Sequence, residues 1–125
     1  FTWWLPCHIK LLSVPYRWGG RDSIGLDCSA LLQLSKAFSG ENIPRDSHQQ
    51  LEYFKKSKKY KIIKLPELKT FSKGDIIYWH GHVAIVIKKN KLIHASSFRG
   101  EVAIENIDDV IKRSNKECFL IKEKN

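Results

Sequence analysis

The sequence predicts an α+β domain, with helices in its first half and a mainly antiparallel sheet of about five strands in its second half. Two observations lead to this prediction. Apolar residues recur at helical spacing as far as Phe54, whereas from Phe71 onward they form short runs rich in β-branched residues. Because the strands follow one another instead of alternating with helices, neighbouring strands are expected to pair antiparallel.

The best-defined helix is predicted to begin directly after Asp27, which is one of the residue types that favour the N-cap position. Its apolar stripe comprises Ala30, Leu31, Leu34, Ala37 and Phe38. Gly40 stands where such a helix should end. A second helix is predicted at residues 47–54, with the hydroxyl of Ser47 as its cap, and shorter helices are predicted at residues 8–12 and 108–113.

The predicted strands are Asp75–Trp79, His82–Ile87, Leu92–Ala95, Val102–Ile104 and Phe119–Ile121. Asn90 and Lys91 form a short turn between the second and the third of these strands. The two strands should therefore pair, which places His82 and His94 on neighbouring strands of one sheet. The lysine-rich stretch 55–64 interrupts the apolar pattern, so it is predicted to be a solvated surface.

The chain has 125 residues, which is enough for one domain but not for two independent cores. Its 22 Lys and Arg residues against 13 Asp and Glu residues give a formal net charge of +9. Nucleic-acid binding is nevertheless not predicted, because the charge is mostly lysine and no helix-turn-helix, zinc-finger or RNA-binding motif is present. The lysines indicate a solvated face or attraction to an anionic polymer or lipid surface. No apolar run approaches the ~20 residues of a membrane-spanning helix, so no transmembrane segment is predicted.

Cys28 is the predicted nucleophile. It would occupy the first turn of the helix that begins after Asp27, where the positive end of the helix dipole favours a thiolate, so we expect its pKa to be lowered. The alternative, a small buried apolar side chain, is less favoured because Asp27-Cys28-Ser29 is polar. That alternative is our interpretation of Cys7 and Cys118. Since the chain has 3 cysteines, at least one thiol must be free.

His82 and His94 are the candidate proton-transfer residues. One imidazole can take the thiol proton while the other accepts the N–H of the first and fixes its tautomer. Each histidine taken alone is more often structural than catalytic. Together with His80 they also offer enough nitrogen ligands for a catalytic zinc ion, but no carboxylate is placed to support one. We therefore predict no metal and no other cofactor, and assign His80 to the rim of a cleft.

A set of short motifs occurs in order and at suitable spacing over roughly residues 15–105. They are Pro15-Tyr16-x-Trp18-Gly19-Gly20, Gly25-x-Asp27-Cys28-Ser29, Pro44-Arg45-Asp46-Ser47-x-Gln49, Gly74-Asp75-Ile76-Ile77, His82-Val83-Ala84-Ile85 and Ile93-His94-Ala95. In these motifs the chain resembles the NlpC-type cell-wall cysteine peptidases of bacteria. The resemblance implies a papain-like core, in which helices that carry the cysteine pack on a sheet that carries the histidines. It also implies that residues 1–125 form a single catalytic domain.

By this resemblance, Cys28 is the nucleophile, His82 the general base and His94 the residue that orients the base. Tyr16 matches a tyrosine beside the nucleophile, whose hydroxyl helps the backbone N–H of Cys28 to hold the oxyanion. The implied reaction is hydrolysis, through a thioester, of the bond between γ-D-glutamate and a diamino acid in murein stem peptides. An acyltransferase or amidase on the same core is an alternative. A non-catalytic wall-binding module is another, although it would be expected to lack one of the three catalytic residues.

The substrate-binding residues implied by the resemblance are Trp18, Asp27, Ser29, Asp46 and Ser47. Asp46 would pair with the ammonium group of a free N-terminal L-alanine, and Ser29 and Ser47 would form hydrogen bonds nearby. Asp46-Ser47 is equally well explained as a helix cap. The chain departs from the family pattern in Ala30, where the family most often has glycine, and in the short loop 79–81, which narrows one wall of the cleft.

The first residue is Phe1 and not methionine, so we expect that a preceding segment was removed. The resemblance implies an upstream Src-homology-3-like module, and the apolar start Phe1-Thr2-Trp3-Trp4 is a candidate contact with it. The lack of a signal peptide is then uninformative about the compartment. Reactive-thiol chemistry and specificity for a free amine favour cytoplasmic recycling of murein slightly over periplasmic remodelling.

Overall fold

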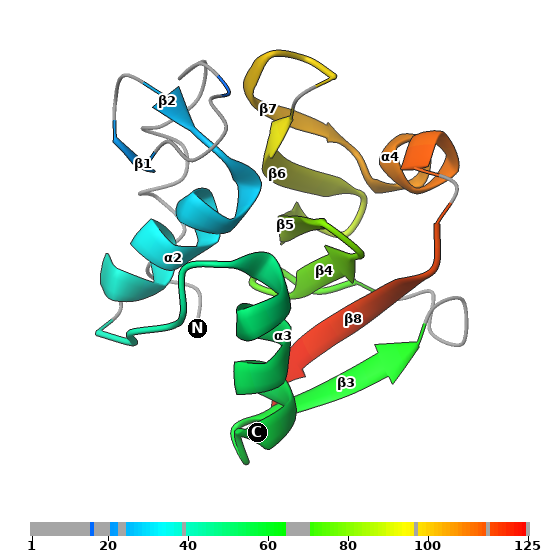
Figure 1. Ribbon diagram of the computed structural model, residues 1–125. Helices are drawn as coiled ribbons and strands as arrows, with labels where there is room; N and C mark the ends of the chain where they lie inside the picture. Colours follow the sequence, from blue (N-terminus) through cyan, green and yellow to red (C-terminus); the bar gives the residue numbers. More distant parts are fainter. Residues whose placement is uncertain are drawn as a thin grey trace.

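The computed structural model describes residues 16, 21–22, 25–38, 40–64, 71–96, 98–114 and 116–124 (Figure 1). Its helices are α2 (Cys28–Phe38), α3 (Ser47–Lys56) and α4 (Ile107–Ser114). A short hairpin consists of β1 (Arg21–Asp22) and β2 (Gly25–Leu26). The remaining strands are β3 (Tyr60–Lys64), β4 (Ile76–Trp79), β5 (His82–Lys88), β6 (Lys91–Ser96), β7 (Glu101–Asn106) and β8 (Cys118–Glu123). The predicted α+β class is confirmed. Cys7, Trp18 and the helix predicted at residues 8–12 lie outside the described residues.

One antiparallel sheet, with the strand order β3-β8-β4-β5-β6-β7, forms the centre of the domain. The last strand, β8, lies between β3 and β4, so the end of the chain joins the lysine-rich segment to the rest of the sheet. The sheet has six strands where about five were predicted, because β3 lacks the apolar pattern by which the other strands were predicted. Lys61 and Lys64 of β3 face solvent and interrupt its apolar residues, of which Tyr60 is buried and Ile62 half-buried.

The sheet has a hydrophobic cluster on each face. In β4, Ile76 and Tyr78 belong to the cluster that includes residues of α2 and α3, whereas Ile77 and Trp79 belong to a cluster with Val110 of α4. Figure 1 shows α2 and α4 on opposite sides of the strands β5 to β7. Side chains alternate between the two faces of a strand, and both faces of the sheet are covered here, so every residue of β4 is buried. The helices therefore hold the middle strands of the sheet in fixed positions.

Candidate active site

The candidate nucleophile, Cys28, is the first residue of α2 and is 8% exposed. Helix α2 packs against β5 and β6, which brings the thiol to the turn that precedes β5. The sulfur lies 3.9 Å from the carbonyl oxygen of Gly81. The backbone N–H of Val83 donates a hydrogen bond to the sulfur. The sulfur is therefore located beside the start of the strand that carries His82.

A chain of hydrogen bonds runs from His82 to a buried carboxylate. Nε2 of His82 and Nδ1 of His94 are 2.8 Å apart, and Nε2 of His94 is 2.7 Å from Oε2 of Glu105. These residues lie on the consecutive strands β5, β6 and β7. The indole of Trp79 packs against the imidazole of His82, with 5.5 Å between the ring centroids. The structure thus brings His82 and His94 together, and the chain leaves Nδ1 as the ring nitrogen with which His82 can receive a proton.

Sequence reasoning missed Glu105 and Arg113. Both Nη atoms of Arg113, on α4, donate to the carboxylate of Glu105 at 3.0 Å. A carboxylate near the end of a strand normally faces solvent, yet Glu105 is 9% exposed. The one available signal was the spacing of two residues from Ala103, which pairs with His94 across the sheet. That spacing places Glu105 on the same face as His94 only once the register of the strands is known.

The electrostatics of Cys28 differ from the prediction. Burial raises the pKa of the thiol, and the negative charge of Asp27 acts in the same direction, while backbone N–H groups of Val83 and Ser29 oppose them. The predicted lowering of this pKa is therefore wrong. The helix start does place N–H groups near the sulfur, but the loss of solvation of a buried thiolate outweighs them.

Burial also disfavours the charged form of both histidines. The pKa of His82 is lowered to about 3, first by burial, then by the adjacent imidazole of His94, which disfavours a second protonated ring, and then by the positive charges of Arg113 and Lys116. The pKa of His94 is lowered by burial as well, although the carboxylate of Glu105 raises it. The thiol of Cys28 and the imidazole of His82 are consequently both neutral near pH 7 in the absence of substrate.

Cys28 opens onto a cleft of about 620 Å³. The cleft is lined by Tyr16, Asp27, Cys28, Ser29, Arg45, Asp46, Ser47, His48, Tyr78, His80 and Gly81. Tyr16 is held there by a 2.8 Å hydrogen bond from its backbone N–H to the carbonyl oxygen of Gly100. Burial, together with the charges of Cys28 and Asp27, raises the pKa of Tyr16, so its hydroxyl remains a hydrogen-bond donor.

Arg45, to which the sequence analysis gave no role, ties one wall of this cleft together. Its Nη2 lies 2.9 Å from the carboxylate of Asp27, and its Nη1 donates to the hydroxyl of Ser29 at 2.8 Å. The other carboxylate oxygen of Asp27 accepts the backbone N–H of Ala30 at 2.9 Å, which caps α2. Asp27 and Ser29 therefore line the cleft, and their side chains are held in place by hydrogen bonds to Arg45 and, for Asp27, to the first turn of α2.

The second wall contains the start of α3, where the predicted cap is wrong. Asp46 and not Ser47 occupies the N-cap position, and its side chain makes no capping hydrogen bond. Its exposed carboxylate lines the cleft. Gln50 is the glutamine that matters in this motif: its buried amide donates to the carbonyl oxygens of Ser29 and Pro44, at 3.0 Å and 2.9 Å. Gln49, quoted in the motif, is exposed.

The sequence of the chain matches a known family of proteins. The family model described as the NlpC/P60 family matches residues 13–118. The chain belongs to the NlpC/P60 family. Dipeptidyl-peptidase 6 of Lysinibacillus sphaericus is 32% identical over 101 residues, which cover 81% of this chain and 34% of that protein. Gamma-D-glutamyl-L-lysine dipeptidyl-peptidase of Bacillus subtilis is 26% identical over 120 residues, which cover 86% of this chain and 38% of that protein.

The fold agrees with the family as well. The peptidoglycan hydrolase RipB of Mycobacterium tuberculosis has a TM-score of 0.75 at 23% identity, over 98% of this chain and 64% of that chain. This likeness confirms the papain-like α+β fold. The NlpC/P60 domain spans well under half the length of either curated relative.

His80 of this NlpC/P60 domain lies with Gly81 in the tight turn that joins β4 to β5. It is exposed and lines the cleft. Since it lies in the turn, it does not share a strand face with His82, as the zinc alternative would need. Within the described ranges, no group of three or more His, Cys, Asp or Glu side chains is arranged to hold a metal ion. In the same part of the chain, no helix is long and apolar enough to cross a membrane.

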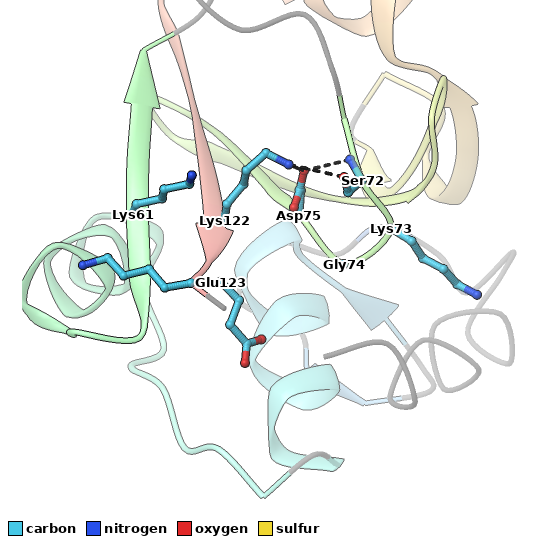
Figure 2. Close-up of a pocket in the computed structure, with 8 residues that line it drawn as sticks. Lys61, Ser72, Lys73, Gly74, Asp75, Lys122 and Glu123 are labelled. Atoms are coloured by element: carbon cyan, nitrogen blue, oxygen red, sulfur yellow. Dashed lines mark hydrogen bonds and ion pairs between the residues drawn. The ribbon is translucent and has the colours of Figure 1, made fainter.

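A second cavity of the NlpC/P60 domain, of about 570 Å³, shares no lining residue with the cleft. It is lined by Lys61, Ser72, Lys73, Gly74, Asp75, Lys122, Glu123 and Lys124. Figure 2 shows Lys122 directed toward Asp75, and Nζ of Lys122 lies 2.6 Å from the carboxylate. Asp75 also accepts the backbone N–H of Ser72 at 2.8 Å. These contacts fix the loop before β4 against β8, which is a structural role.

Proposed function

We propose that the domain is a cysteine peptidase that hydrolyses the bond between γ-D-glutamate and a diamino acid in peptidoglycan stem peptides. The observation that carries the proposal is the position of the Cys28 thiol, in a cleft and beside the start of β5, where His82 begins the hydrogen-bond chain to His94 and Glu105. Membership of the NlpC/P60 family supports the reaction class. The name of the Bacillus subtilis relative supports the choice of a γ-D-glutamyl bond.

In the first half of the reaction, Sγ of Cys28 attacks the carbonyl carbon of the γ-glutamyl amide while the thiol proton passes to Nδ1 of His82. Because both groups are neutral beforehand, the ion pair forms only as the carbon–sulfur bond forms. His82 then gives this proton to the nitrogen of the diamino acid, and the carbon–nitrogen bond breaks. The amine product leaves, and the γ-glutamyl group remains on Cys28 as a thioester.

In the second half, water attacks the thioester carbonyl while His82 accepts a proton from it. The carbon–sulfur bond breaks, and the proton on His82 returns to the Cys28 sulfur. The γ-carboxyl group is released and loses its remaining proton to solvent. In both halves an oxyanion forms at the carbonyl oxygen. The backbone N–H of Cys28, at the start of α2, and the hydroxyl of Tyr16 are the donors that we assign to it.

The cleft also contains a carboxylate that can explain selectivity for a peptide with a free amino group. Asp46 presents an exposed carboxylate in the cleft that holds Cys28, and this carboxylate is not used to cap α3. In our proposal it pairs with the free ammonium group of a stem peptide, with the hydroxyls of Ser29 and Ser47 nearby. Acetylating that amino group should therefore weaken binding, and replacing Asp46 by Asn should abolish the difference between free and acetylated peptides.

The test compares hydrolysis of L-Ala-γ-D-Glu-L-Lys with that of its α-linked isomer, followed by mass spectrometry. We expect cleavage of the γ-linked peptide by the wild type and by Cys118→Ala, and none by Cys28→Ala. Transfer of the glutamyl group to an added amine in preference to water would instead indicate an acyltransferase. Binding of the peptide without cleavage by the wild type would indicate a wall-binding module and refute the proposal.

A further inference from the structure

The carboxylate of Glu105 stands at the inner end of the hydrogen-bond chain. It lies 2.7 Å from Nε2 of His94 and receives two hydrogen bonds from Arg113 at 3.0 Å. Nε of Arg99 lies 3.6 Å from it. Although burial favours its neutral form, the bonds from Arg113 and His94 hold the pKa of Glu105 below its ordinary value. Glu105 is therefore ionised near pH 7, and an ionised carboxylate can only accept hydrogen bonds.

Because Glu105 can only accept, it determines which ring nitrogen carries the proton in both His94 and His82. His94 must carry its proton on Nε2 to donate to Glu105, so Nδ1 of neutral His94 is an acceptor. His82 must then carry its proton on Nε2 to donate to His94. Its Nδ1 is left with the lone pair that a base needs. A donor in place of Glu105 would reverse both tautomers and put a proton on Nδ1 of His82.

Arg113 fixes the carboxylate itself. Its two parallel hydrogen bonds set the plane of the Glu105 side chain. The guanidinium also stacks on Phe98, with its carbon 4.1 Å from the ring centroid. Arg113 belongs to α4, which covers the face of the sheet away from α2. The series of hydrogen bonds that begins at His82 thus ends on α4, a helix with no residue in the lining of the cleft.

We propose that Glu105, held by Arg113, is a positioning residue that acts through His94 to fix the tautomer of His82 and so leaves Nδ1 of His82 available to Cys28. This inference rests on the proposed peptidase function. It assigns no contact between Glu105 and the substrate. The charged or titratable groups that act on His94 are His82 on β5, Glu105 on β7, Arg113 on α4 and Arg99 in the turn between β6 and β7.

The direct test is ¹⁵N NMR of the histidine rings in the wild-type chain near pH 7. Nδ1–H and Nε2–H tautomers differ in their ring nitrogen shifts, so the measurement needs no substrate. We expect both His82 and His94 to be neutral with the proton on Nε2. A wild-type His82 with its proton on Nδ1 would overturn the proposal.

Glu105→Gln tests the cause, because an amide can donate as well as accept. We expect Nδ1–H of His82 to appear in its spectrum, and kcat to fall on the order of 10²- to 10⁴-fold with KM unchanged, because a catalytic histidine in the wrong tautomer cannot accept the thiol proton. The matched control is Glu101→Gln, the same change at an exposed position of β7, which should alter neither. An unchanged tautomer with full activity in Glu105→Gln would refute the positioning role.

Arg113→Gln provides a second variant, with exposed Lys112→Gln on α4 as its control. Without Arg113 the carboxylate of Glu105 takes up a proton at higher pH, so the acid limb of the kcat profile should move to higher pH. A profile identical to that of the control would contradict the proposal. If the wild type cleaves no stem peptide, the proposed function fails, while the tautomer of His82 still decides the role of Glu105.

Discussion

The thiol of Cys28 lies between the backbone carbonyl oxygen of Gly81 and the backbone N–H of Val83. The negative charge of the preceding residue, Asp27, raises the pKa of the thiol. Burial of this sulfur and of the His82 ring disfavours a resting ion pair. Attack by the thiol must then be coupled to proton transfer in the same step. Such a site reacts with a bound carbonyl but slowly with a small alkylating reagent, because only the thiolate reacts with the reagent.

Alkylation of Cys28 should therefore depend on pH. Since the thiol pKa is raised, we expect the rate with iodoacetamide to rise about tenfold per pH unit from about pH 6 to about pH 8. Asp27→Asn removes a charge that raises this pKa, so its profile should lie at lower pH. Mass spectrometry of the Cys28 peptide after brief labelling measures the rate. A rate that is already constant below pH 7 would show that the thiolate forms without substrate.

Helix α2 depends on Asp27 at its start, because one carboxylate oxygen caps Ala30 and the other meets Arg45. We expect Asp27→Ala to lower the free energy of unfolding by about 1–2 kcal/mol, the usual loss for a capping side chain. Asp27→Asn keeps a capping oxygen and should lose less, with Arg45 still bonded to Ser29. Urea denaturation at pH 7 gives both values. Equal losses would mean that the ion pair with Arg45, and not the cap, stabilises the helix.

A buried polar network joins α2, α3 and β3. Lys36 donates to the hydroxyl of Tyr60 at 2.8 Å, and the hydroxyls of Tyr60 and Tyr53 each donate to Glu41 at 2.6 Å. Lys36 is 2% exposed, and its burial lowers its pKa. The network explains how a lysine-rich segment is held against the core, since its one buried aromatic residue, Tyr60, is also its polar anchor.

Tyr60→Phe should lower the free energy of unfolding by about 1–3 kcal/mol, because it leaves the buried ammonium of Lys36 without its hydroxyl partner. Tyr53→Phe is the matched control. It removes one hydrogen bond to the same carboxylate from a half-buried ring, and should cost about 0.5–1.5 kcal/mol. Thermal or urea unfolding of both variants decides. Equal losses would indicate that the buried lysine needs no partner at Tyr60.

For the domain as a whole, the buried histidines couple stability to pH. In the folded state the pKa of His82 is about 3, whereas in the unfolded chain a histidine titrates near its ordinary value of about 6.5. Below that pH the unfolded chain binds the extra proton, so stability falls as the pH is lowered from about 6.5 toward 3. One such group contributes a slope of about 1.4 kcal/mol per pH unit.

His82→Gln should flatten this dependence between about pH 6 and pH 4, because it removes one of the groups that must stay neutral to fold. His80→Gln is the matched control, since His80 is exposed. The free energy of unfolding of both variants, measured by urea denaturation at several pH values, tests the prediction. The same slope in both would show that His82 is protonated in the folded domain.

The local pattern of the sequence was enough to predict much of this architecture. Asp27 and the apolar stripe behind it define α2, because capping and helical periodicity involve residues within a few positions of one another. The turn predicted at Asn90 and Lys91 lies one residue earlier, at Lys89 and Asn90, because Lys91 already pairs with Lys88. The prediction that this turn pairs β5 with β6, and so brings His82 to His94, is confirmed. The motifs around these residues were also sufficient to indicate the family.

Other features depend on contacts between distant segments, and only the tertiary structure decided them. Glu105 meets His94 because β7 pairs with β6 in one register, and α4 then brings Arg113 to it. Strand β3 exists because β8 returns to pair with it, although its lysines hide the pattern. The pKa of Cys28 is raised because the sheet buries the helix start that, by itself, would favour a thiolate. Burial and register are properties of the assembled sheet, so no short stretch of sequence contains them.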